Sequence, residues 1–331
     1  MKQIIRKISI IFIILIFVAC IILGKVNFKS NGNKQIDNAI KEVNINVQDK
    51  NIGIDIKDII NTLSSDKFEG RLLGTKGNEY TVQYMLNIFE ELKLNFVFEN
   101  SYLHEYSLET KTYKNVIGKI SGNNDKNAVI LSAHFDHIGA MNGEIYRGAL
   151  DNASGVSALS KIAYTLKEAS EKKIFDFDII IAAFNGEECG LSGSRAFVKD
   201  IKTQYNKLYN INIDCIGSIN GGNLALKNIS RIKGSEKLYK DIKNVMGKHK
   251  IEFSDTAISE EAFKAGIGIG DHHSFEEAGI PNIYIGQEGI KSLVHTVTDT
   301  PETLDYNKIE KISDAISDFI ETNGSNIFEE I

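Results

Sequence analysis

Tryptophan is absent from the sequence, and cysteine and proline are scarce, at three and two residues in a chain of 331. Three cysteines exclude the dense disulfide framework that stabilises small secreted domains. Basic residues are not in excess, because 38 Lys and Arg stand against 44 Asp and Glu, which gives a net charge of −6. Without a surplus of positive charge the chain cannot neutralise many phosphates, so we expect no nucleic-acid partner.

The composition is otherwise that of an ordinary globular protein. Hydrophobic residues make up 42% of the chain and charged residues 25%, values that exclude a disordered or fibrous protein. We therefore expect a domain with a large buried core, and we look for function in its motifs.

The clearest long apolar run lies at the N-terminus, where Lys2, Arg6 and Lys7 precede a stretch from Ile8 to Leu23. Basic residues followed by an apolar run are typical of a secretion or anchoring element. The positive-inside rule places the basic side in the cytoplasm and the rest of the chain outside. We therefore predict a signal anchor over residues 1–26, with an extracellular domain held at the membrane.

The same segment has a second interpretation, as the signal of a lipoprotein. Residues Phe17 to Cys20 are similar to a lipoprotein cleavage box, and Cys20 would then carry the lipid. Cleavage without lipidation would release a secreted protein. The apolar residues Ile21 to Leu23 would directly follow a lipidated cysteine, which favours the uncleaved anchor.

The remainder of the chain divides into a polar segment and a folded domain. Residues 27–53 are rich in Asn, Lys and Asp without a sustained periodicity, which predicts a tether. From residue 54 to residue 331, apolar runs of strand length alternate with longer amphipathic segments. We therefore predict a single α/β domain over 54–331, with a central, mostly parallel or mixed sheet flanked by helices.

The expected elements of this domain follow from the apolar runs. The predicted strands are 115–120, 128–133, 177–184, 208–213 and 282–285. The predicted helices are 78–92, 155–169, 235–248 and 307–322. No internal repeat interrupts this order, which agrees with one domain.

Three of the predicted strands run into side chains that can ionise. These runs and the residues after them are 129–133 with His134 and Asp136, 179–184 with Glu187 and Glu188, and 209–213 with Asp214. In open α/β sheets, ligands bind at the carboxyl ends of the strands, because the loops there converge on a crevice. The sequence therefore predicts one polar site at this edge of the sheet.

Two further motifs supply possible ligands. Asp151 stands just before a predicted helix, and His295 lies near the C-terminus. Alone, Asp151 would be an ordinary helix N-cap, but its place in an ordered set of donors favours a site. Imidazole nitrogens and carboxylate oxygens suit Zn²⁺ and could also bind Co²⁺ or Mn²⁺. A catalytic zinc ion takes about three protein ligands and keeps a place for water, so two ions share these donors best.

The order and spacing of these motifs are similar to those of the M28 family of co-catalytic zinc aminopeptidases. The resemblance implies that His134 and Asp214 bind one zinc ion. It implies that Glu188 and His295 bind a second ion and that Asp151 bridges the two. Several separate motifs in the same order make the resemblance specific, whereas any one of them alone would be weak.

The resemblance covers roughly residues 68–304 and assigns roles to two carboxylates that do not bind metal. Glu187 matches the general base, which takes a proton from the attacking water and passes it to the leaving amine. Asp136 matches the carboxylate that orients the first ligand histidine from behind. Asp299 stands shortly after His295 and is predicted to support it in the same way.

One position departs from the family pattern. Val294 stands where some family members carry a tyrosine beside the last ligand histidine, so the contact to the oxyanion passes to zinc alone or to another residue such as Tyr284. Arg71 is assigned to structure. The histidines with weaker claims are His137, His272 and His273, for which a structural role is at least as good, and His104 and His249, which are predicted to lie on the surface.

The resemblance implies an exopeptidase that removes N-terminal residues from peptides with a metal-activated water. One alternative is a glutaminyl-cyclase-like acyltransferase, which resembles a one-zinc enzyme and generally surrounds its substrate with tryptophan; this chain has none. Another is a non-catalytic, peptidase-like surface module, which would have lost ligands, and none is missing. Side-chain preference depends on variable loops such as 219–232 and 251–268, whose sequence does not predict it.

Overall fold

The computed structural model describes residues 54–228, 232–254 and 270–331. The predicted anchor at 1–26, the tether at 27–53 and most of the loop 251–268 lie outside the described residues. Within the described residues, none of the helices has both the length and the apolar character needed to span a membrane.

An eight-stranded sheet forms the centre of the domain, in the order β1-β2-β6-β3-β7-β10-β8-β9. Its strands are β1 Leu103–Leu108, β2 Lys111–Ile120, β3 Asn127–His134, β6 Asp178–Phe184, β7 Lys207–Ile213, β8 Leu224–Asn228, β9 Phe253–Ser254 and β10 Asn282–Gln287. The four central strands β6, β3, β7 and β10 are parallel, whereas β1, β2 and β8 run antiparallel to a neighbour. The predicted mixed sheet with a parallel centre is confirmed.

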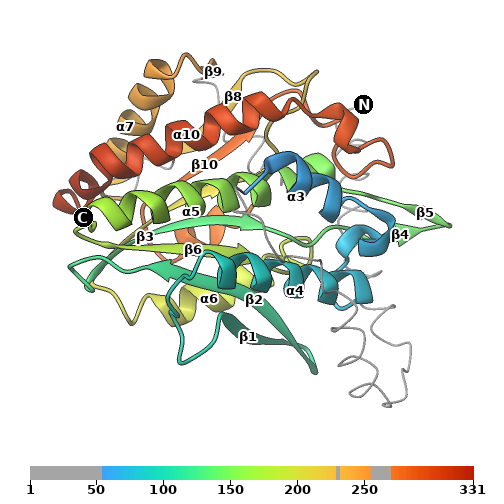
Figure 1. Cartoon of the computed structure of the whole chain (residues 1–331), viewed down its shortest axis with the longest axis horizontal. Helices are drawn as coiled ribbons and strands as arrows, with labels where there is room; N and C mark the ends of the chain where they lie inside the picture. The colour runs from blue at the N-terminus through green and yellow to red at the C-terminus, as the bar shows by residue number, and fades with distance from the viewer. Residues whose placement is uncertain (1–53, 229–231, 255–269) are drawn as a thin grey trace, which may run out of the picture.

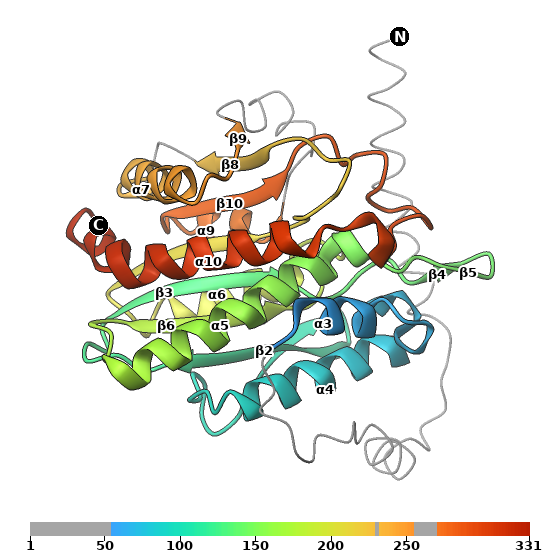
Figure 2. The same ribbon diagram turned by 45° about the horizontal axis from the view of Figure 1, so that its top comes forward.

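Helices cover both faces of this sheet. They are α3 Ile56–Leu63, α4 Lys76–Glu91, α5 Ser154–Lys172, α6 Ser192–Ile201, α7 Ser235–Lys248, α9 His272–Glu277 and α10 Tyr306–Asn323. Figures 1 and 2 show α5 and α10 side by side along one face, with α3 next to α5. The four predicted helices are confirmed with small shifts at their ends, while α3, α6 and α9 were not predicted.

The central strands are buried on both faces, which explains their continuous apolar sequence. Alternate residues point to opposite faces, so Val129 and Leu131 of β3 join the large core cluster under α5 and α10. Ile130, between them, joins a second cluster with Phe197 of α6 and Phe275 of α9. This double burial fixes the register of the strands and so the positions of the residues at their ends.

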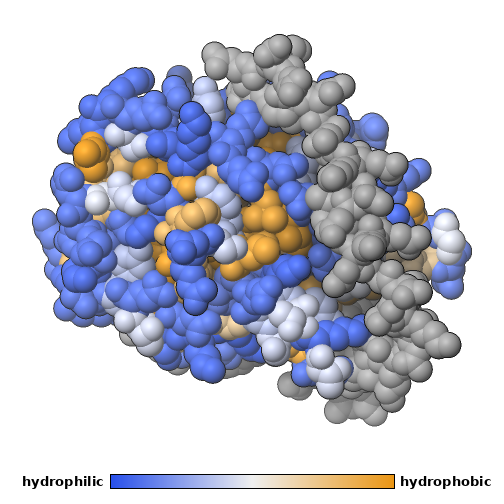
Figure 3. All heavy atoms as spheres, turned by 60° about the horizontal axis from the view of Figure 1, so that its bottom comes forward, coloured by the Kyte–Doolittle hydropathy of each residue, from blue (hydrophilic) through white to orange (hydrophobic). Residues whose placement is uncertain are grey.

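Three smaller features mark the surface. A hairpin of β4, Ala140–Met141, and β5, Glu144–Ile145, projects from the domain in Figures 1 and 2. In the view of Figure 3, apolar side chains gather near the centre of a face that is otherwise mostly hydrophilic. An open pocket of about 530 Å³ between α4 and the start of β1 is lined by apolar residues such as Leu86 and Phe96 and by polar ones such as Glu90 and Lys93.

Candidate metal centre

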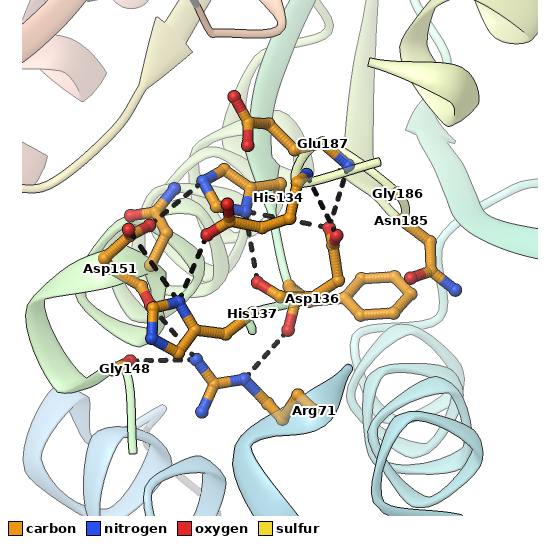
Figure 4. A network of polar contacts seen from close by, with 12 residues as sticks. Arg71, His134, Asp136, His137, Gly148, Asp151, Asn185, Gly186 and Glu187 are labelled. Carbon is orange, nitrogen blue, oxygen red and sulfur yellow. Dashed lines mark hydrogen bonds and ion pairs between the residues drawn. The ribbon is translucent and has the colours of Figure 1, made fainter. Parts of the chain in front are cut away.

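The predicted site residues lie together at the carboxyl ends of the parallel strands, and Figure 4 shows several of them pointing toward one another. His134 ends β3, and the loop after it carries Asp136. The loops after β6, β7 and β10 supply Glu187 with Glu188, Asp214 and His295, and the turn before α5 supplies Asp151. The ionisable side chains therefore gather at one edge of the sheet, because parallel strands present their carboxyl ends at the same edge.

One group of donors contains His134, Asp151 and Asp214, all buried. The Nε2 atom of His134 lies 3.4 Å from Oδ1 of Asp151 and 3.4 Å from Oδ1 of Asp214. All three donor atoms lie within 4.8 Å of one another, which is the spacing of atoms that surround a common point. One nitrogen and two carboxylate oxygens are a ligand set that suits zinc.

A second group of donors contains Asp151 again, with His137, Glu188 and His295. The Nε2 atom of His295 lies 2.9 Å from Oε1 of Glu188 and 3.1 Å from Oδ2 of Asp151. Asp151 thus turns Oδ1 toward the first group and Oδ2 toward the second. His137 was a weak candidate from sequence, yet its ring lies among these donors.

Asp136 supports the site from behind. Nδ1 of His134 lies 3.2 Å from the backbone carbonyl of Asp136 and 3.7 Å from its carboxylate. A carbonyl only accepts hydrogen bonds, so Nδ1 carries the proton and Nε2 is free for a metal. The carboxylate of Asp136 accepts the backbone N–H groups of Glu187 at 3.1 Å and Glu188 at 3.2 Å, and so holds the loop after β6 as well.

Asp299 supports a different residue from the one predicted. Its two oxygens accept the backbone N–H groups of Leu150 at 2.6 Å and Asp151 at 3.1 Å. The prediction that it supports His295 is therefore corrected, because the turn before α5 presents these N–H groups directly to the carboxylate. Asp299 therefore holds Asp151, the residue that both groups of donors share, in position.

The electrostatics of the centre favour a bound cation. Burial alone would raise the pKa of Glu188, but the nearby imidazoles of His295 and His137 lower it well below its usual range. Burial would lower the pKa of His295, yet Glu188 and Asp151 raise it to about 12. Buried carboxylates in excess of buried cations carry a large desolvation cost, which a metal ion removes. The donors present therefore fit a metal centre in chemistry and in position.

The sequence profile of peptidase family M28 matches residues 115–320, which is more than half of the chain. The chain belongs to peptidase family M28. The matched range contains every predicted ligand of this M28 domain, from His134 to His295. A comparison with curated proteins found no match.

Several solved structures share the fold of this M28 domain. An aminopeptidase of Legionella pneumophila, LapA, has a TM-score of 0.66 at 17% identity, over 90% of this chain and 76% of that chain. A glutaminyl cyclase of Fimbriiglobus ruber has a TM-score of 0.66 at 18% identity, over 82% and 95%. The zinc aminopeptidase BSAP of Bacillus subtilis has a TM-score of 0.61 at 16% identity, over 80% and 93%. At these identities the likeness concerns the fold.

A fully buried arginine, Arg71, lies behind the donors of the M28 site, as Figure 4 shows. Its guanidinium donates to the backbone carbonyls of Leu63, Phe135, Arg147, Gly148 and Asp151, at 2.7 to 3.4 Å. Burial lowers its pKa to about 10, although nearby carboxylates, Asp299 first, oppose the shift. Its structural assignment agrees with these bonds, which connect the loop after β3 to the turn that carries Asp151.

Asparagine side chains hold the loop that carries the glutamate pair, a role that the sequence did not reveal. The amides of Asn185 and Asn78 hydrogen-bond to each other at 2.9 and 3.0 Å, and the backbone N–H of Asn185 donates to Asn115 at 2.9 Å. Asn115 in turn lies 3.1 Å from Nδ1 of His104, whose Nε2 is 3.0 Å from Asp200. The prediction of a surface His104 is therefore wrong, since it is 4% exposed and packs inside this network.

Two more buried residues border the first group of donors. The hydroxyl of Tyr284 donates to the backbone carbonyl of Asp214 at 3.4 Å, so it supports the end of β7. Asp271, at the start of α9, is fully buried, and burial raises its pKa to about 7. Its charge interacts with those of His134 and Asp214, so Asp271 lies near the first group of donors.

Proposed function

We propose that this M28 protein is a zinc aminopeptidase that removes N-terminal residues from peptides with the help of two metal ions. The observation that most supports this proposal is the position of Asp151, whose two oxygens face different groups of donors. A carboxylate between two sets of ligands is what a pair of co-catalytic metal ions requires.

The assignment of ligands follows from the two groups. His134, Asp214 and Oδ1 of Asp151 would hold one ion, while Glu188, His295 and Oδ2 of Asp151 would hold the other. When bound, the ions would polarise the scissile carbonyl and lower the pKa of a water molecule. Asp136 would keep His134 in place through its backbone carbonyl, and Asp299 would keep Asp151 in place through the backbone N–H of that residue.

Glu187 is the residue that we propose moves the proton. It belongs to neither group of donors, but its charge interacts with His134, Glu188 and Asp214, so it lies beside them. Burial raises its pKa well above the usual value. A carboxyl group with a raised pKa is better matched to accept a proton from water and to return it to a leaving amine near neutral pH.

The proposal is tested by metal content and by one substitution. The purified full-length chain should bind close to two zinc ions and release N-terminal residues from short peptides. Glu187→Gln should keep the metal and lose about 10²–10⁴-fold in turnover, because it removes the base and not a ligand. Glu277→Gln, a change at a half-exposed carboxylate that pairs with Arg195, is the matched control. Full activity in Glu187→Gln would refute the assigned role.

A glutaminyl-cyclase-like acyltransferase is the second candidate, because cyclases occur among the proteins of similar fold. The presence of two groups of donors and the absence of tryptophan favour the peptidase. Cyclisation of N-terminal glutamine, together with a stoichiometry of one zinc ion, would instead identify a cyclase.

We also propose that residues 1–26 anchor the protein and that the catalytic domain faces the outside, where peptides would be its substrates. The basic residues and the apolar run at the N-terminus support this arrangement. The full chain should then sediment with membranes, and added protease should degrade the domain in intact cells. Recovery of the protein in the soluble cell fraction would refute the anchor.

A further inference from the structure

The five ligands proposed above leave His137 without a role, although it is fully buried among them. Its Nδ1 atom lies 3.2 Å from Oε1 of Glu188 and 3.7 Å from Oδ2 of Asp151. A ring nitrogen of His137 also lies within 4.8 Å of a ring nitrogen of His295. Four donor atoms from four side chains therefore surround the second position.

The imidazole ring of His137 is held in this orientation. A Cβ atom on Gly148 would lie 2.6 Å from Cγ and 2.7 Å from Cδ2 of the ring, so the ring rests directly on the glycine backbone. On another side, its centroid is 5.6 Å from the centroid of the His295 ring. In a packed interior such a ring cannot turn away without displacing its neighbours.

The contacts of His137 differ from those of an ordinary buried histidine. Nδ1 is close to Glu188 but makes no hydrogen bond to it, and Nε2 has no hydrogen-bond partner among the described residues. Nε2 of His295, in contrast, is hydrogen-bonded to the same Glu188 oxygen at 2.9 Å. A buried polar side chain without a partner is rare in folded proteins, and a nitrogen so placed is suited to bind a metal ion.

The direction of the Nδ1 atom decides between two roles. If Nδ1 only donated a hydrogen bond to Glu188, it would be aligned with Oε1, whereas a second ligand of the same ion needs no such alignment. Nε2 is unpartnered in either tautomer, so it does not distinguish the roles. The close but unaligned pair of Nδ1 and Oε1 favours the second arrangement.

We propose that His137 is a fourth protein ligand of the second metal ion, which makes the two positions unequal. The second position would be closed by His137, Asp151, Glu188 and His295, as in tightly held zinc sites with four protein ligands. The first position, with three protein ligands, keeps a place for water and exchanges its ion more readily. This inference rests on the two-metal function proposed above.

The first experiment needs no substitution. The metal-free full-length chain is given one equivalent of Zn²⁺, and X-ray absorption spectroscopy counts the imidazole nitrogens around the ion. Two imidazoles are expected, from His137 and His295, because the four-ligand position fills first. One imidazole would overturn the proposal, since every other assignment of a single ion to these groups contains one histidine.

The second experiment compares two substitutions by zinc titration against a competing chelator. His137→Ala should weaken the tighter of the two positions by at least about 10–100-fold and leave the weaker one unchanged. His137→Asn is the matched control, because its amide can donate a hydrogen bond near the place of Nδ1 but is a poor zinc ligand. Wild-type affinity in either variant would overturn the proposal. A wild-type chain that binds no zinc would instead refute the proposed function.

Discussion

Buried carboxylates lie at both ends of strand β6, but the side chains that face them differ between the two ends. At its amino end, Asp178 is 1% exposed, and its carboxylate accepts hydrogen bonds from Lys119 and Tyr205 at 2.7 Å and from the backbone of Gly122 at 2.9 Å. Every charge there is satisfied by the chain itself. Such a closed cluster is complete as a structural element and offers nothing to a ligand.

At the carboxyl end of the same strand, histidines lie against the buried carboxylates. Within the described segments, no Lys or Arg side chain forms an ion pair with Asp136, Asp151, Glu188 or Asp214. Arg71 lies close to these carboxylates, but its guanidinium donates its hydrogen bonds to backbone carbonyls. The difference teaches that a buried carboxylate by itself is not a sign of function, whereas a set of buried carboxylates that faces histidines in place of lysine or arginine is.

Metal removal should act only on the site at the carboxyl end of β6, and it should change activity and stability more than either substitution described below. We expect a chelator to abolish activity and to lower the melting temperature, because loss of a ligand held at 1,000 times its Kd costs about 4 kcal/mol of stability. Activity assays and thermal unfolding, before and after zinc is restored, measure this. A melting temperature that does not change when the metal leaves would contradict the electrostatic account of the centre.

Removal of the buried arginine should have the next largest effect. Arg71→Met leaves five carbonyls without their donor, and we expect a loss of about 3 kcal/mol or more in the free energy of unfolding, together with weaker zinc binding. Arg71→Lys should recover part of both. Arg195→Met, at a half-exposed arginine, is the control and should change stability by about 0.5 kcal/mol or less. Chemical denaturation with and without zinc would measure these values, and equal effects at Arg71 and Arg195 would count against the role of Arg71.

The smallest effect is expected at the amino end of β6. Asp178→Asn weakens the bonds to Lys119 and Tyr205 and should cost about 1–3 kcal/mol of stability. Zinc content and turnover per folded molecule should stay at wild-type values, because the substitution lies at the far end of the strand from the donors. Urea unfolding and metal analysis of the same sample would test this, and a loss of zinc would break the distinction between the two ends.

The central part of the fold could be predicted from sequence, since buried parallel strands need unbroken apolar runs. The elements that were missed lack this signal. Strand β1 reads LHEYSL and lies at the edge of the sheet, where polar residues alternate with apolar ones. Helix α9 has only six residues, too few to display a helical period. The histidine of β1, His104, was misjudged for the same reason, because an edge strand gives no sign of which face is covered.

The gathering of several proposed ligands could also be predicted, because His134 and Asp214 stand at strand ends and Asp151 just before a helix. The residues that hold the proposed ligands in place could not be predicted, because the two partners of each hydrogen bond are distant in the chain. Asp299 bonds to Leu150 across 149 positions, and Asn185 bonds to Asn78 across 107. His137 was underrated because a second histidine after a ligand has no distinctive spacing, and its place among the donors depends on how Gly148 packs against its ring.

The bonds of Arg71 also define how much of the chain the site needs. The family profile begins at residue 115, so a fragment cut to match it would contain every proposed ligand and yet lack Arg71 and the Leu63 carbonyl. In such a fragment the loop after β3 and the turn before α5 would lose the cation that holds them together. The unit that binds metal is therefore longer than the unit that sequence profiles recognise, and any truncated form made for study or for engineering should begin before α3.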